Sequence, residues 1–142
     1  MGVILTEETM ALIARFEQLT GASSRDVLKD DDNERYIFIV NPGEMGRAIG
    51  KSGANIKKTS DVLGRRCEAV EYADDPAQFL RNCLLPAQVA EVQFSDYDGG
   101  VIAHVMVHAD ERGIAIGKAG KNIVKTKKLA QRLHDISDVF LE

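Results

Sequence analysis

The sequence of 142 residues contains little cysteine and proline and no tryptophan: two Cys, three Pro and no Trp. Two cysteines cannot form a disulfide framework, and Cys67 and Cys83 are too far apart for a C-x-x-C redox or zinc motif. We expect both to be buried as small apolar side chains, and the sequence leaves open a single bridge between them. The low proline content and the 44% of hydrophobic residues exclude a collagenous or disordered chain and predict a globular protein.

Long hydrophobic runs are also absent. No apolar stretch approaches the roughly 20 residues that a membrane span needs. The apolar residues 1–5 lead into Glu7 and Glu8, with no basic region of the kind that opens a signal peptide. These absences predict a soluble, cytoplasmic protein with no membrane partner.

Positive charge is not in excess either: 18 Lys and Arg stand against 22 Asp and Glu, for a net charge of -4. By itself this sum argues against a nucleic-acid-binding protein. The distribution argues the opposite, because residues 46–66 and 112–132 together hold 13 of the 18 bases and a single acid, Asp61. Two cationic segments in an otherwise acidic chain indicate two local sites for a polyanion.

The two cationic segments belong to an internal repeat. Residues 46–59 (GRAIGKSGANIKKT) reappear at an offset of 67 as residues 113–126 (GIAIGKAGKNIVKT), with ten of fourteen positions identical. The same offset aligns residues 36–40 with residues 103–107. Two copies of this length indicate a tandem of two domains rather than a solenoid, and we place these domains at residues 1–73 and 76–142.

Each half is predicted to contain a helix, two strands, a short helix, a glycine loop, a longer helix and a final strand. In the first half the strands are expected at 27–28, 36–40 and 67–72, and the short helix at 44–49. In the second half the strands are expected at 89–94, 101–107 and 136–141, and the short helix at 111–116. Turns rich in Asp, Asn and Gly between the first two strands favour a hairpin. The predicted fold class is α+β, with a three-stranded sheet packed against helices in each half.

The first helix of each half has clear end signals. Thr6 is the expected N-cap and Gly21 the expected end in the first half, and Asp75 and Pro76 are the expected N-cap and first helical residue in the second. The expected inner faces are Met10, Ile13 and Phe16 in the first half and Phe79, Leu80, Cys83 and Leu84 in the second. Four aromatic residues are expected in the cores: Tyr36, Phe38, Phe79 and Phe94.

Three interpretations compete for the glycine loops 50–53 (GKSG) and 117–120 (GKAG). A tight helix–helix turn would explain one glycine of positive φ in each loop, but neither the second glycine nor the lysine. A mononucleotide P-loop would need a glycine where the chain has Met45, and a hydroxyl where the second copy has Ala119. The third interpretation, a backbone clamp for single-stranded nucleic acid, accounts for the glycine pair, the lysine and the duplication together.

In such a clamp, glycines let the sugar-phosphate backbone approach the main chain, and the following helix directs free N–H groups at the phosphates. Lys51 and Lys118 add a cation at the same point. The bases would lie on an aliphatic groove, because none of the eight aromatic residues falls within either cationic segment. A stripe on the longer helix of the second copy is expected to face solvent or a polyanion: Lys121, Lys125, Lys128 and Arg132.

The loops resemble those of KH domains, in which a GXXG loop clamps nucleotides. Residues 49–56 and 116–123 both show the pattern I-G-K-x-G-x-N-I, and the preceding helix and strand resemble the type II arrangement. As a tandem, the whole chain is similar to the archaeal relatives of the NusA family of transcription factors. Bacterial members of that family have in addition a polymerase-binding domain and an S1 domain, for which this sequence has no counterpart.

The resemblance implies a protein that binds single-stranded RNA, such as a nascent transcript, in transcription termination or antitermination, with RNA polymerase as a candidate partner. The alternative is a KH adaptor in ribosomal RNA processing or ribonucleoprotein assembly. The sequence shows no nucleophile beside a base and no cluster of metal ligands, so we expect a binding protein rather than an enzyme, with neither cofactor nor metal. The expected RNA contacts are Arg47, Ile49, Gly50, Lys51, Ser52, Gly53, Ile56 and Lys57 in the first copy and Ile116, Gly117, Lys118, Ala119, Gly120, Lys121, Ile123 and Lys125 in the second.

Overall fold

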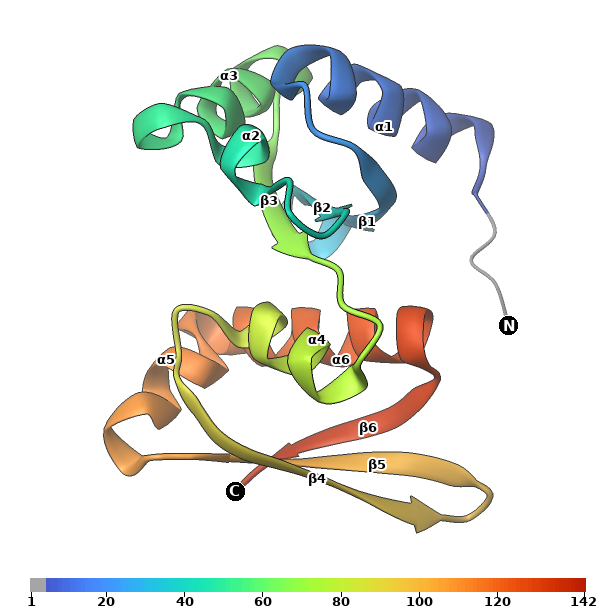
Figure 1. Ribbon diagram of the computed structural model, residues 1–142, viewed down its shortest axis with the longest axis vertical. Helices are drawn as coiled ribbons and strands as arrows, with labels where there is room; N and C mark the ends of the chain where they lie inside the picture. Colours follow the sequence, from blue (N-terminus) through green and yellow to red (C-terminus); the bar gives the residue numbers. More distant parts are fainter. Residues whose placement is uncertain (1–4) are drawn as a thin grey trace. The chain divides into compact units, whose positions relative to one another are not determined.

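The computed structural model describes residues 5–142. Residues 1–4 lie outside the described residues. They include the start of the first predicted domain and most of the apolar segment 1–5. The chain divides into two compact units, one ending at Ala73 and the other comprising Asp74–Glu142 (Figure 1). Both units have the order of elements that the sequence predicts, so that prediction is confirmed.

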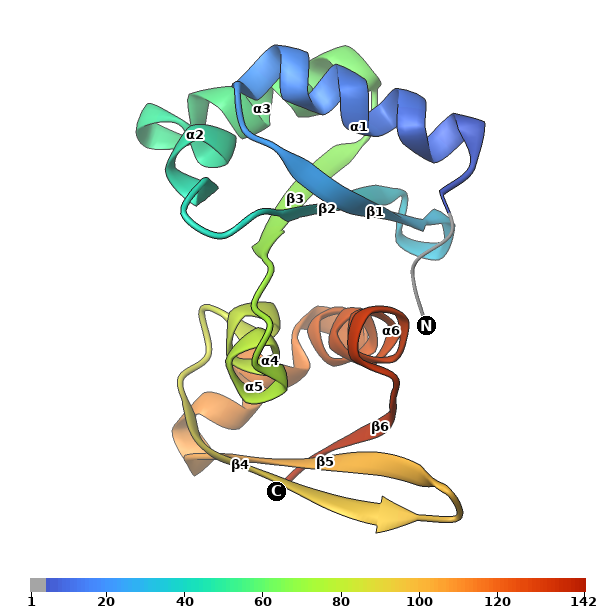
Figure 2. The ribbon, with the colours of Figure 1, turned by 45° about the vertical axis from the view of Figure 1, so that its right-hand side comes forward.

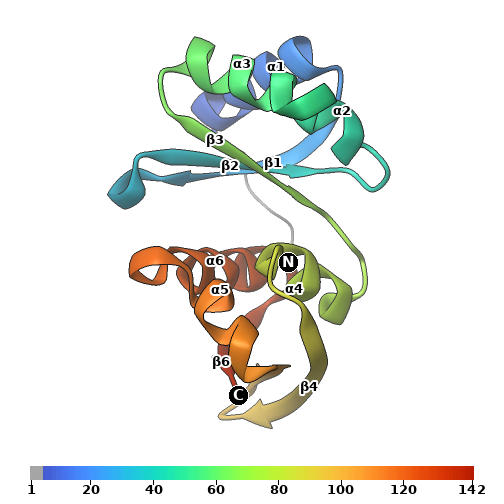
Figure 3. The same cartoon turned by 90° about the vertical axis from the view of Figure 1, so that its left-hand side faces the viewer.

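The first unit is a three-stranded sheet with its helices on one face (Figure 3). Its elements are α1 (Glu7–Thr20), β1 (Ser24–Asp30), β2 (Arg35–Val40), α2 (Met45–Ile49), α3 (Ala54–Leu63) and β3 (Arg66–Glu71). The central strand β2 runs antiparallel to β1 and parallel to β3. β1 begins three residues before the predicted strand, because Ser24 and Asp26 are polar yet buried and so give no hydrophobic signal.

The core of the first unit contains Phe16 of α1 and Phe38 of β2, whose rings stack with centroids 4.2 Å apart. The predicted ends of α1 are confirmed: the Thr6 hydroxyl accepts a backbone N–H in the first turn, and Gly21 ends the helix with a φ of 78°. The prediction for Met10 is wrong, because this side chain is 48% exposed. Met10 lies about 120° around the helix from Phe16, at the margin of the apolar stripe.

The second unit repeats this architecture (Figure 2). Its elements are α4 (Pro76–Leu84), β4 (Val89–Tyr97), β5 (Gly100–Val107), α5 (Arg112–Ile116), α6 (Lys121–His134) and β6 (Ile136–Leu141). The central strand β5 is antiparallel to β4 and parallel to β6, while α4 and α6 cover one face of the sheet. The two sheets, each packed with helices, confirm the predicted α+β class.

The start of α4 also matches the prediction. The Asp75 carboxylate accepts the backbone N–H of Gln78, and Pro76 is the first helical residue. All four side chains of the predicted inner face are fully buried: Phe79, Leu80, Cys83 and Leu84. The capping residues and the apolar periodicity of α4 therefore determine both where it starts and which face packs on the sheet.

The aromatic residues expected in the cores differ in burial. Phe38 and Phe79 are fully buried, and Tyr36 is half-buried against the edge of Phe38. Phe94 is 43% exposed, so its assignment to the core is wrong. Phe94 lies on β4, an edge strand that continues beyond the predicted end to Tyr97.

The two cysteines are buried and free, Cys67 in β3 and Cys83 in α4, so a bridge between them is not formed. Burial raises the pKa of the Cys67 thiol to about 11 and that of the Cys83 thiol to about 12. Both side chains therefore act as small apolar residues at neutral pH.

Within residues 5–142, the structure has no helix that is both long enough and apolar enough to cross a membrane.

Candidate nucleic-acid interface

The two GXXG loops have the same backbone conformation. The φ and ψ angles are 77° and 172° at Gly50 and 80° and 168° at Gly117. Three of the four residues in each loop have positive φ, including Ser52 at 55° and Ala119 at 56°. The duplicated sequence therefore forms a duplicated sharp turn, which joins α2 to α3 in the first unit and α5 to α6 in the second.

The first glycine of each loop has no room for a side chain. A Cβ atom on Gly50 would lie 2.8 Å from the backbone nitrogen of Asn55, and a Cβ on Gly117 would lie 2.8 Å from that of Asn122. A positive φ combined with a ψ near 170° is also a region that only glycine adopts readily.

The second glycine of each loop is left-handed, and a Cβ there would meet no atom within 4 Å. Both glycines thus have positive φ, so the expectation that a helix–helix turn would explain only one glycine per loop is wrong. The space beside the second glycine remains open to a ligand.

The different surroundings of the two glycines predict different costs of substitution. Gly50→Ala should lower the free energy of unfolding by about 3 kcal/mol, because the new Cβ clashes with Asn55 and the backbone is strained. Gly53→Ala should cost only about 1 kcal/mol, the strain of a left-handed alanine in open space. Urea unfolding of the two variants measures the difference, and equal stabilities would contradict this account of the loop.

An asparagine shortly after each loop, Asn55 or Asn122, has a structural role that the sequence did not predict. The Asn55 side-chain amide donates to the carbonyl oxygen of Arg47 at 2.7 Å. The Asn122 amide donates to the carbonyl oxygen of Leu84 at 3.2 Å, with a longer contact to that of Ile114 at 3.4 Å. Each asparagine ties the start of the longer helix to the short helix before it. The repetition of Asn at the offset of 67 is the sequence signal that could have predicted this structural role.

The cations predicted around the first loop are at the surface. Lys51 and Lys57 are exposed, and the Arg47 side chain is 69% exposed, with a contact of 3.5 Å to the Glu44 carboxylate. The Ser23 hydroxyl and backbone N–H both donate to Glu44 and hold the pKa of its carboxyl below the usual 4.5. Glu44 therefore stays ionised at neutral pH and fixes the start of α2 beside Arg47.

The cations of the second copy are placed differently. Lys118 and Lys121 are exposed, but Lys125 is only 6% exposed, so the prediction that it lies on an outward-facing stripe is wrong. Lys125 lies one turn before the fully buried Leu129, on the inner side of α6. At the matching position of α3, the exposed Lys58 precedes Val62, which is 45% exposed.

The surfaces beside the two loops also differ in character. Ile114 and Val124 occupy the positions that correspond to Arg47 and Lys57, and they are 43% and 40% exposed. At these two positions the first loop is flanked by cations and the second by aliphatic side chains, whereas the exposed Lys121 beside the second loop corresponds to Ala54 beside the first.

The four isoleucines predicted to line the aliphatic grooves are all half-buried: Ile49, Ile56, Ile116 and Ile123. Ile56 and Ile123 also pack against the hydrophobic cores of their own units. These positions leave part of each side chain at the surface beside the loop, where it can contact an apolar ligand face.

The architecture and the loops define a class of protein that comparison with known families identifies. Residues 13–74 match the model of the KH domain, and residues 76–138 match that of the NusA-like second KH domain. The chain is thus a tandem KH-domain protein. It belongs to the NusA-like family, and the resemblance found in the sequence is confirmed.

Archaeal members of this family are similar over nearly the whole chain. The identity is 39% over 141 residues to the probable transcription termination protein NusA of Halococcus morrhuae, and 40% to that of Halobacterium salinarum, with 99% of each chain covered. The protein of the same name from Methanococcus vannielii is 34% identical over 98% of this chain and 79% of its own. The crystal structure of APE1850 superposes with a TM-score of 0.90 at 31% identity, covering 97% of this chain and 100% of that one.

Proposed function

We propose that this protein binds single-stranded RNA through its two GXXG loops and acts in transcription termination or antitermination in the cytoplasm. The observation that carries the proposal is the duplicated turn, with nearly identical angles in two units whose neighbouring side chains differ. The proposed contacts are the residues expected from the sequence other than Lys125, which is buried. We take residues 1–73 and 76–142 as the two binding domains.

The proposed contact with phosphate uses the helix that follows each loop. Gly53 and Gly120 are the N-cap residues of α3 and α6, and no side chain of the described residues caps either helix at this end. The first N–H of each helix donates to the carbonyl oxygen of Lys51 or Lys118. The positive dipole end and the later N–H groups of the first turn can therefore bind phosphate oxygens, with the Lys51 and Lys118 side chains as flanking cations.

Two clamps in one chain support binding to a single RNA. β3 ends at Glu71 and α4 begins at Pro76, so four residues, 72–75, lie between these two elements, and a fully extended chain from Glu71 to Pro76 spans at most about 18 Å. Binding at one loop therefore raises the effective concentration of RNA at the other. At about four nucleotides per KH module, we expect a site of about eight nucleotides or somewhat more.

The salt dependence of binding tests which loop contacts phosphate through side chains. The logarithm of the affinity should fall with the logarithm of salt concentration by about 0.7 for each phosphate neutralised. Arg47→Gln with Lys57→Gln should reduce this slope by about 1.4, if each cation meets one phosphate. Fluorescence titrations of a single-stranded RNA over a range of salt concentrations give the slopes.

The matched control places glutamine at the corresponding positions of the second copy, Ile114→Gln with Val124→Gln. We expect this variant to keep the original slope, because no charge is lost. Equal slopes for both variants and the parent chain, or equal affinity for duplex DNA, would count against a side-chain contact with RNA phosphates at the first loop.

The role in transcription is supported by the relatives, which carry the name of probable transcription termination proteins. RNA polymerase is a candidate partner on the same basis. The second candidate function, an adaptor in ribosomal RNA processing or ribonucleoprotein assembly, would use the same loops. Crosslinking of bound RNA in the native cell separates the two, because the first predicts nascent transcripts and the second ribosomal RNA precursors.

A further inference from the structure

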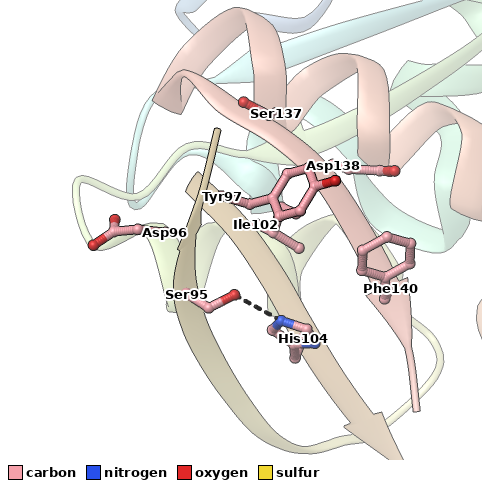
Figure 4. Close-up of a pocket in the computed structure, with 8 residues that line it drawn as sticks. All are labelled: Ser95, Asp96, Tyr97, Ile102, His104, Ser137, Asp138 and Phe140. Carbon is pink, nitrogen blue, oxygen red and sulfur yellow. Dashed lines mark hydrogen bonds between the residues drawn. The ribbon is translucent and has the colours of Figure 1, made fainter. Parts of the chain in front are cut away.

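The second sheet has an exposed face with a hollow of about 590 Å³, a size typical of pockets for small organic groups (Figure 4). Ala103 and Val105 of β5 pack into the core beneath α4 and α6, so Ile102 and His104, which alternate with them, point to the opposite face. The hollow is lined by Ser95, Asp96, Tyr97, Ile102, His104, Ser137, Asp138 and Phe140. It therefore lies on the side of the sheet away from the helices that flank the GXXG loop.

Two accessible aromatic rings stand beside an aliphatic side chain in this hollow. Tyr97 is 70% exposed and Phe140 is 43% exposed. Figure 4 shows them on either side of Ile102, on the strands β4 and β6 that flank β5. Rings that are accessible on a sheet face can stack on a flat aromatic ligand, so the hollow favours such a ligand over a branched aliphatic one.

Hydrogen bonds hold the floor of the hollow in one arrangement. His104 Nε2 lies 2.9 Å from the Ser95 hydroxyl, and its Nδ1 lies 3.3 Å from a carboxylate oxygen of Glu142. The imidazole ring also contacts Phe140, with ring centroids 5.9 Å apart. A ligand would meet a preformed surface, so little entropy is lost in ordering these side chains.

Neither carboxylate among the described residues that line the hollow selects a charged ligand. Asp96 alternates along β4 with Ser95 and Tyr97, and Figure 4 shows its side chain pointing away from the rings. The Asp138 carboxylate lies 3.2 Å from Lys127 Nζ, so its charge is already balanced. An uncharged ligand group therefore fits the hollow better than an ionised one, which would lose water without gaining a partner.

Hydroxyl groups of the hollow require a ligand with polar edges. The Ser95 and Ser137 side chains line the hollow, and a serine hydroxyl can donate one hydrogen bond and accept others. An acyl chain or a leucine side chain would displace water from these groups without replacing its hydrogen bonds, which costs free energy. The hollow thus selects a group that is flat, uncharged and able both to donate and to accept hydrogen bonds.

The hollow is not part of the repeat. At the offset of 67, the residues that correspond to Tyr97, His104 and Phe140 are Asp30, Ile37 and Ala73. The GXXG turns are duplicated almost without change, but these rings occur in the second copy alone. The hollow therefore supplies a contact that neither loop provides.

We propose that this hollow binds a nucleobase of single-stranded RNA, an inference that rests on the RNA binding proposed above. The base stacks on the Tyr97 ring over Ile102, and its edge hydrogen-bonds to the serine hydroxyls. Nucleobases have all three properties that the hollow selects, and in a single strand their faces and edges are accessible. The second unit then contacts RNA on two sides, through its loop and through the outer face of its sheet.

The test uses NMR of the full ¹⁵N-labelled chain with two probes, adenosine and a single-stranded oligoadenylate. Both should cause saturable shifts of the β4, β5 and β6 amides that surround the hollow. Tyr97→Leu keeps an apolar side chain but removes the ring, and it should weaken the affinity for adenosine at least about fivefold. Tyr97 is exposed, so the spectrum away from the hollow should stay unchanged.

Phe94→Leu is the matched control, because Phe94 is 43% exposed on the same strand but pairs with Ala103, on the face that packs against the helices. This variant should bind adenosine as the parent chain does. Equal affinities of the two variants for adenosine would overturn the proposal. Equal shifts at the hollow from N-acetyltryptophanamide would also overturn it, because the indole ring is flat and uncharged but carries only one donor and no acceptor.

The oligoadenylate distinguishes this inference from the proposed function. Shifts at the GXXG loops with none at the hollow would overturn the inference and leave the proposed function standing. A chain that responds to the oligoadenylate at neither place would contradict both. Shifts at the hollow from adenosine alone would assign it to free nucleosides and overturn its role in RNA binding.

Discussion

Replacing Lys51 and Ser52 by aspartate, together with the matching Lys118 and Ala119, is expected to weaken the binding of single-stranded RNA more than about a hundredfold. Each loop then presents two carboxylates where the proposed clamp places phosphate. The repulsion acts at the ends of α3 and α6, whose dipoles otherwise favour an anion. Fluorescence titration at a fixed salt concentration measures the loss.

The conformation of the loop makes this substitution mild for the fold. Ser52 and Ala119 have φ angles of 55° and 56°, in the left-handed region that aspartate tolerates better than most residues. All four replaced side chains are exposed. We therefore expect circular dichroism spectra and unfolding midpoints close to those of the parent chain.

A variant with the same change of charge outside the loops separates a local clamp from general electrostatics. Ala14 and Arg15 are adjacent, exposed residues of α1, and Ala14→Asp with Arg15→Asp alters the charge by as much as Lys51→Asp with Ser52→Asp. We expect each loop pair alone to weaken binding far more than this control. Equal losses would show that RNA responds to net charge and would refute the clamp.

Arg35→Ala is expected to lower the free energy of unfolding of the first unit by about 3 kcal/mol or more. Arg35 is 4% exposed and donates to Asp30 at 2.7 Å and to Glu68 at 2.9 Å. Asp30 is itself 2% exposed, so the variant leaves a buried carboxylate without this cation. The cost of the unbalanced buried charge exceeds that of the lost contact alone. Urea unfolding gives the change in free energy.

Arg66 supplies the matched control, because it contacts the same Glu68 oxygen at 3.6 Å while its side chain is 77% exposed. Arg66→Ala should change the stability by less than about 0.5 kcal/mol, since solvent screens an exposed pair. Similar losses from Arg35→Ala and Arg66→Ala would contradict the importance assigned to burial.

Sequence patterns sufficed where a local signal determines the structure. Thr6, Gly21 and Asp75 mark helix ends by the hydrogen bonds and backbone angles they favour, and the structure places them at those ends. The repeat predicted the same order of elements in both units, because segments with similar sequences form the same helices, turns and strands. The position and duplication of the GXXG loops follow from the same evidence.

The same patterns failed where burial depends on residues distant in the sequence. Asp30 falls in the predicted turn between the first two strands, yet it is buried beside Arg35, whose guanidinium also pairs with Glu68 of the distant strand β3. Lys58 and Lys125 occupy equivalent positions of the repeat, yet the first is exposed and the second buried. Periodicity places a residue on a face of a helix but does not say what covers that face.

The sequence by itself therefore determined the helix ends and the two glycine turns, because each depends on residues within a few positions of one another. The repeat at an offset of 67 added the two-domain organisation and the α+β class of both halves. Only the tertiary structure decided which cations reach the surface beside the loops and which lie inside. It also brought Tyr97, His104 and Phe140 together on one sheet face, since these residues lie on three strands that hydrogen bonding aligns. Burial and proximity arise from packing over the whole domain, which no local pattern encodes.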